Sequence, residues 1–126
     1  MRLDHFERAF TGIGQAAVAS LINVSAYDFI YISVESTSVT GAPTSWHFDM
    51  VPTEADGDQL DTQADSYRTE NVTVAAGSKV PIDRIRTQVV EPVIRIGFPA
   101  VTIKPDFTGG TTPTVTGIVH VIGRIL

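Results

Sequence analysis

Three histidines are the residues of this sequence best suited to chemistry at a site. His5, His47 and His120 lie far apart in the chain, whereas sequence motifs for zinc place histidine or carboxylate ligands at close spacing. His47 and Asp49 are two residues apart, so in a strand they share one face and could together hold a metal ion. A solvated sheet face explains this pair more simply, and we predict no metal and no cofactor. His120 lies between two valines, which favours an interface or half-buried position.

An acidic segment at residues 54–65 is the second candidate. Its Asp56-Gly57-Asp58 core resembles part of a calcium loop, since hard cations bind clustered carboxylate oxygens around a tight turn. The glycine and the terminal glutamate of the helical calcium loop are not at the required offsets, which favours a solvated loop. The alternative is a calcium-dependent β-sandwich module that binds carbohydrate or cell surfaces, with Trp46 or Tyr67 stacked on sugar.

Several classes of function are disfavoured by what the sequence lacks. It contains no nucleophile elbow, phosphate loop, dinucleotide fingerprint or catalytic-triad pattern, so we predict that it is not an enzyme. It has no cysteine, which excludes thiolate chemistry and disulfide scaffolds. Its formal net charge of −5 gives no basic stripe for phosphates, so we expect no nucleic-acid partner. We also expect no signal peptide and no membrane partner, since no apolar run approaches the ~20 residues of a membrane span.

The elements that must position these residues are indicated by composition. Val, Ile and Thr number 15, 12 and 15, whereas Leu occurs four times in the 126 residues. β-branched side chains are restricted at the first side-chain torsion and pack well on pleated sheets. The composition therefore excludes an all-helical protein.

Alternation of apolar and polar residues predicts individual strands. It is clearest at residues 29–35 and 46–50, and turn signals recur at the spacing of about 8–12 residues that is typical of sandwiches and small barrels. Further strands are predicted at residues 16–22, 71–74, 79–90, 93–96, 101–103 and 115–126. We predict an all-β fold, with residues 15–126 as a single antiparallel β-sandwich or jelly-roll-like barrel.

Residues 1–14 allow two interpretations. Leu3, Phe6 and Phe10 have the spacing of one face of a short amphipathic helix. A helix of this length is marginal by itself in water. The alternative is an N-terminal arm that becomes ordered only against a neighbour and docks onto a capsid or an adjacent subunit.

The C-terminal residues 117–126 carry apolar side chains on both faces of the predicted strand. One set fills the core, and the other needs cover from the N-terminal segment or from a neighbouring subunit. The chain has only two lysines, a residue that commonly guards sheet edges against association. We therefore expect a homo-oligomer. The predicted subunit or capsid interface comprises Leu3, Phe6, Phe10, Ile118, His120, Ile122 and Leu126.

Two stretches resemble motifs of short head-associated proteins of tailed phages and related particles. They are residues 71–86 (NVTVAAGSKVPIDRIR) and residues 108–119 (TGGTTPTVTGIV), which together make up less than a third of the chain. In that family a V-x-A-G-x-x-x-P-I-x-x-x-R-V stretch precedes a T-G-T-T-A-T-G-I-V ending. This sequence departs from the pattern because residues 91–107 are inserted between the motifs and residues 113–115 replace a tighter turn.

The resemblance implies a virion structural protein of the decoration (cement), spike-base or fibre-base type. The two departures leave the choice among these types open. The implied partners are the major capsid protein and further copies of the chain, as a homotrimer or homopentamer. The implied location is the capsid surface, after assembly in the host cytoplasm. The resemblance implies no catalytic residue.

Overall fold

The computed structural model describes residues 2–58, 67–68, 79–86, 89–91, 93–95 and 98–126, and all of its regular elements are β-strands. The strands are β1 (Arg2–Gly14), β2 (Ser20–Asn23), β3 (Phe29–Thr40), β4 (Ser45–Thr53), β5 (Tyr67–Arg68), β6 (Lys79–Arg86), β7 (Val89–Glu91), β8 (Val93–Arg95), β9 (Ala100–Thr108) and β10 (Thr114–Ile125). All the strand pairs are antiparallel. The predicted all-β fold class is confirmed.

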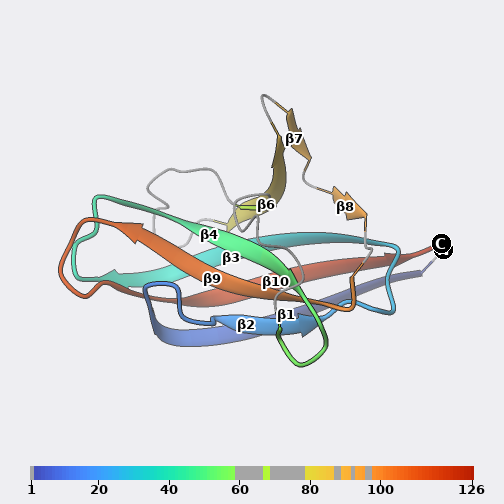
Figure 1. Ribbon diagram of the computed structural model, residues 1–126, viewed down its shortest axis with the longest axis horizontal. Coiled ribbons are helices and arrows are strands. Elements are labelled where there is room, and N and C mark those ends of the chain that lie inside the picture. The colour runs from blue at the N-terminus through green and yellow to red at the C-terminus, as the bar shows by residue number, and fades with distance from the viewer. Residues whose placement is uncertain (1, 59–66, 69–78, 87–88, 92, 96–97) are drawn as a thin grey trace.

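The strands form two sheets that β6 connects. The path of hydrogen-bonded neighbours runs β1-β10-β3-β6-β5-β4-β9-β2, with β7 beside β6 and β8 beside β3. β6 pairs with β3 through residues 79–82 and with β5 through residues 83–84. Figure 1 shows β4 and β9 crossing over β3 and β10, with β1 and β2 along the same side of the molecule. The arrangement is an antiparallel sandwich.

The core forms between the two sheets, and alternate side chains of β3 and β10 contribute to it. β3 contributes Ile30, Ile32 and Val34, all of them 0–1% exposed. Phe10 of β1 and Phe48 of β4 meet edge to face with their ring centroids 6.0 Å apart, a favoured aromatic geometry that joins the two layers. The alternation predicted at residues 46–50 places residues 46, 48 and 50 in this core, but His47, on the face predicted to be solvated, is also buried at 9% exposure.

The helix considered for the N-terminal residues is wrong. β1 pairs with β10 from Arg2 to Gly14, with a register shift between Phe10 and Ile13. A spacing of four residues, as between Phe6 and Phe10, fits a strand as well as a helix. In a strand every second side chain lies on the same face, so residues i and i+4 share a face there too. Pairing with β10 satisfies backbone groups that a short helix would leave exposed at its ends. Leu3, at an odd position, faces the opposite side from Phe6.

β10 lies between β1 and β3, and this position decides what covers it. Val119 and Val121 face the core and are fully buried. The N-terminal segment, one of the two covers considered for the other face, lies beside β10 in the same sheet rather than over it. Ile118 is partly exposed and Ile122 is 40% exposed as a result.

Two further predictions differ from the structure or lie outside its described part. The strand predicted at residues 16–22 is shorter and begins at Ser20, after a turn in which Ala16 has a φ of 55°. The strand predicted at residues 71–74 lies outside the described residues. Among the described residues there is no helix of the length and apolar character needed to cross a membrane.

Candidate functional site

The outer face of the β1–β10–β3 sheet, which points away from the second sheet, brings ionisable and apolar side chains together. Glu7 of β1 pairs with His120 of β10, and His120 pairs with Ser33 of β3. Residues directly opposite each other in antiparallel strands have side chains on the same face. His5 lies two residues from Glu7 and Glu35 two residues from Ser33, so both also belong to this face.

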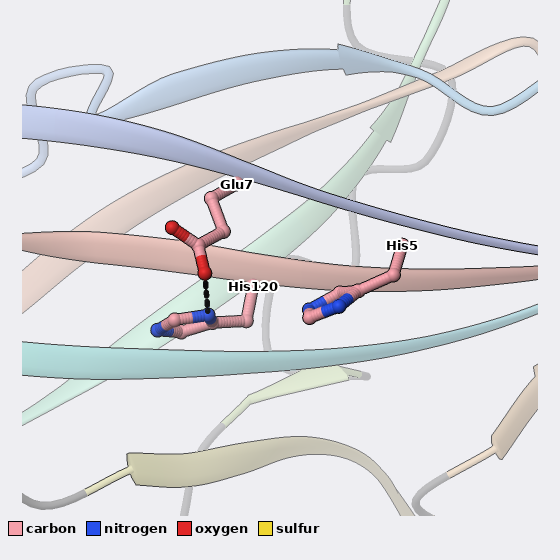
Figure 2. A group of neighbouring side chains, drawn as sticks. All are labelled: His5, Glu7 and His120. Carbon is pink, nitrogen blue, oxygen red and sulfur yellow. Dashed lines mark ion pairs between the residues drawn. The ribbon is translucent and has the colours of Figure 1, made fainter.

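His5, Glu7 and His120 form a cluster on this face, which Figure 2 shows in close-up. The Nδ1 atom of His120 lies 3.3 Å from Oε1 of Glu7, and the rings of His5 and His120 are stacked with centroids 6.5 Å apart. One potential ligand atom from each of the three residues lies within 4.8 Å of the others. The cluster is thus compact enough to share one ion.

His120 is held in one orientation by a second carboxylate. Its Nε2 atom lies 2.9 Å from Oε1 of Glu35 in a hydrogen bond. A carboxylate only accepts hydrogen bonds, so Nε2 carries the proton and donates it. His120 is 8% exposed, and its Nδ1 atom is buried without a hydrogen-bond partner. The Nδ1 atom of His120, which faces Glu7, is therefore a buried polar atom without a hydrogen bond.

An apolar pocket adjoins the cluster at the end of the sheet where β1 begins and β10 ends. Its volume is about 120 Å³, and it is lined by Leu3, Phe29, Ile30, Tyr31, Ile122 and Arg124. Leu3 and Ile122 are 59% and 40% exposed. These are large apolar side chains in contact with solvent on one face of one sheet, which is the kind of surface that marks interaction sites.

The predicted interface residues are divided between the two faces of this sheet. Leu3, Ile118, His120 and Ile122 belong to the outer face, and Leu126 follows the last strand and is 69% exposed. Phe10 is in the core and 5% exposed, and Phe6 packs against the core next to Tyr27. The two phenylalanines therefore contribute to packing within the chain. Contact of the outer-face residues with a partner stays a prediction.

His47 and Asp49, the pair that could share a metal, do lie together. Nε2 of His47 is 3.0 Å from Oδ1 of Asp49 and 3.5 Å from Oδ2 of Asp106. Asp106 reaches this position because β9 pairs with β4, where residue 106 lies opposite residue 47. Its other oxygen accepts a hydrogen bond of 2.7 Å from the Gln15 side chain. This group has one histidine, and both carboxylates approach the same ring nitrogen.

The acidic segment is described only as far as residue 58. Glu54, Asp56 and Asp58 are exposed and close to one another, and Oδ1 of Asp56 accepts a hydrogen bond from the Asp58 amide at 3.0 Å. This is the bonding of an ordinary turn. Trp46 is 5% exposed in the core, so its proposed role in stacking on sugar is wrong. The Tyr67 side chain lies outside the described part of the structure.

Sequence reasoning missed the two carboxylates that lie beside the His120 ring. Glu7 and Glu35 both contact the ring of His120, yet neither is near it in the sequence. The only local signal was the alternation of His5 and Glu7, which places both on one side of a strand once the segment is recognised as a strand. The helix considered as one interpretation of residues 1–14 would have separated them by about 200° around its axis.

Comparisons with known proteins were made on both sequence and fold. No protein-family model matches the chain, and no curated protein sequence matches it. The fold is similar to the SPBc2 prophage-derived protein YomS, with a TM-score of 0.51 and 14% identity over 98% of this chain and 96% of that chain. It is also similar to VP2 of the infectious bursal disease virus subviral particle, with a TM-score of 0.50 and 13% identity over 98% of this chain and 33% of that chain.

Proposed function

We propose that this chain is a non-enzymatic structural protein of a phage or virus particle, which self-associates and binds the particle shell as a decoration (cement) or spike-base protein. The outer face of the β1–β10–β3 sheet makes the contact with a second copy. The major capsid protein is the further partner, and the protein acts at the capsid surface.

The comparisons support this proposal at the level of fold. One similar structure is a prophage-derived protein that matches the chain over nearly its whole length. The other is a protein of a subviral particle. A fold does not by itself imply a function, whereas the exposed surface of a chain decides what it contacts.

The observation that carries the proposal is the apolar pocket with its exposed rim. Leu3, Ile122 and Leu126 are 59%, 40% and 69% exposed, and the first two line the pocket. Covering such a surface with a second copy removes apolar area from water, which contributes about 25 cal/mol for each Å² before the costs of association. Symmetric oligomers use one such patch on every copy.

Association through this face is favoured over pairing of the sheet edge. Among the described strands β1 pairs only with β10, so its other edge is available to a partner strand. Arg2, Asp4, Glu7 and Arg8 are spread along it, and charges on an edge strand oppose the addition of another chain. The face beside that edge instead presents the exposed apolar side chains of Leu3 and Ile122.

The test of self-association is the solution mass by light scattering across a concentration series. We expect a discrete oligomer for the native chain, and a shift toward monomer for Ile122→Glu because the substitution places a charge in a desolvated contact. Leu21→Glu is the matched control. Leu21 has a similar exposure of 44%, but it lies in β2 at the other end of the strand path.

A monomer at all concentrations would contradict self-association in solution, and equal effects of the two substitutions would contradict the choice of face. Shell binding is tested separately, by co-sedimentation of the chain with particles produced without it. We expect binding by the native chain and by Leu21→Glu. Deletion of residues 1–14 is not a suitable test, because it would remove a whole strand and the core residue Phe10.

A further inference from the structure

We propose that His5, Glu7 and His120 bind a divalent transition-metal ion of the zinc type, and that Glu35 positions His120 for it. The site joins the edge strand β1 to β10, and through Glu35 to β3. It lies on the same outer face as the proposed contact with a second copy, but it is argued from its own geometry and not from the virion role. It replaces the sequence-based expectation of no metal, which rested on the wide separation of the histidines in the chain.

The distances suit a small ion with nitrogen and oxygen ligands. Zinc binds histidine nitrogen and carboxylate oxygen at about 2.0–2.2 Å, so two ligand atoms of a tetrahedral site are about 3.3–3.5 Å apart. Nδ1 of His120 and Oε1 of Glu7 are 3.3 Å apart. The candidate atom of His5 is within 4.8 Å of both. His5 is exposed on its strand, so its side chain has room to rotate toward the other two ligands.

The hydrogen bonding of His120 is that of a metal ligand. Because the Nε2–H of His120 donates its hydrogen bond to Glu35, the neutral ring has its lone pair on Nδ1. That lone pair is buried, lacks a hydrogen-bond donor and faces the Glu7 carboxylate. A metal ion between these two electron-rich atoms relieves their repulsion, as a proton on Nδ1 also would. Metal-binding histidines typically donate their other N–H to a carboxylate, as His120 does to Glu35.

The ligand types select the class of ion. Two imidazoles and one carboxylate favour zinc, nickel or copper over calcium and magnesium, which prefer oxygen ligands. The group around His47 offers one ring nitrogen to two carboxylates, and the group at Glu54 offers carboxylates alone. Three protein ligands leave a fourth position for water on this exposed face.

The experiment is a calorimetric titration of ZnCl2 into the chelator-treated chain, together with thermal unfolding in the presence of Zn2+, of Ca2+ or of EDTA. We expect zinc to bind with a stoichiometry of one ion per chain and to raise the melting temperature, because it binds the folded state. Calcium should leave the melting temperature unchanged. Binding should weaken as the pH is lowered, since protons compete for the ligand atoms.

Four variants locate the site. His5→Ala and Glu7→Gln each remove an exposed ligand and should weaken zinc binding at least tenfold, while Glu35→Gln should weaken it about 10–100-fold through the orientation of His120. Asp106→Asn disrupts the other histidine cluster and is the matched control, with binding unchanged. Far-UV circular dichroism confirms that each variant is folded.

Absence of zinc binding to the folded native chain would overturn the proposal. So would binding that survives both His5→Ala and Glu7→Gln, or binding that is lost in Asp106→Asn. A chain that ignores zinc but is stabilised by mild acid would instead have a proton on His120 between its two glutamates, which also overturns the proposal. The zinc titration measures metal binding and light scattering measures the mass of the chain, and the four variants leave Leu3 and Ile122 unchanged. A failure of this proposal is therefore distinguishable from a failure of the virion proposal.

Discussion

Tyr27 lies in the segment between β2 and β3, and its side chain contacts two residues of β1. Its hydroxyl donates a 3.0 Å hydrogen bond to Asp4, and its ring stacks on Phe6 with centroids 6.4 Å apart. Burial of the ring raises the pKa of Tyr27 above its ordinary value of 10.0, and the hydrogen bond to Asp4 and the charge of Asp4 add to the increase. The neutral phenol is therefore the form that the folded state favours.

We predict that this contact makes stability depend on alkaline pH. The native chain holds the phenol proton more tightly than the unfolded chain does, so the stabilisation is fully present below pH 10 and is lost as the pH rises through the native pKa. Tyr27→Phe should lower the free energy of unfolding by about 1 kcal/mol at neutral pH and should flatten the decrease at high pH. Urea unfolding at a series of pH values measures both effects, and identical pH profiles for the two chains would contradict the prediction.

At the scale of the element, β10 has a position at which no side chain fits. Gly117 lies opposite Phe10 in β1 and Ser36 in β3, beside an irregularity in the register with β3. A Cβ atom there would collide with the backbone carbonyl oxygen of Glu35 and would lie 3.1 Å from the Phe10 ring. A backbone oxygen in a paired strand cannot move aside as a flexible side chain can.

We therefore expect Gly117→Ala to lower the free energy of unfolding by about 1–3 kcal/mol, in the range measured for overpacked sites. Gly14→Ala is the matched control, because the nearest atom to its added methyl group is 3.9 Å away, at the carbonyl oxygen of Pro113. The control should change stability by no more than about 0.5 kcal/mol. Urea midpoints at one protein concentration give the comparison, and equal stability of the two variants would contradict this account of the strand.

At the scale of the whole molecule, net charge and the apolar face have opposite effects on association. Each copy carries a formal charge of −5, so copies that approach each other repel at low ionic strength. The proposed contact is mainly apolar, with Leu3 and Ile122 at its rim. Salt shortens the range of the repulsion, from about 30 Å at 0.01 M to about 8 Å at 0.15 M.

We predict that self-association becomes tighter as NaCl is added. Light scattering at fixed protein concentration should give a larger mass-average species at about 0.15 M than at about 0.01 M ionic strength. Ile122→Glu should stay dissociated at both, because salt does not remove the cost of burying its charge. A decrease in mass with added salt would contradict an apolar contact and would indicate ion pairs between copies.

The fold class could be predicted because its signals are local. A β-branched composition and the alternation at residues 29–35 and 46–50 indicate a strand from the residues of that segment alone, without reference to its neighbours in the fold. It was also predicted that one set of side chains in residues 117–126 fills the core, and Val119 and Val121 belong to the set that does so. Residues 1–14 were ambiguous for the same reason, since a spacing of four satisfies both the helical and the strand period.

The sequence by itself determined that the chain forms an antiparallel β-sandwich and that one side of its last strand needs cover. Only the tertiary structure decided that β1 lies beside β10, and that Glu7 and Glu35 meet the two ring nitrogens of His120. Glu35 and His120 are 85 residues apart, and no local pattern encodes a contact of that span. Strand order and register decide it, because a shift of one residue would turn every side chain of a strand to the other face.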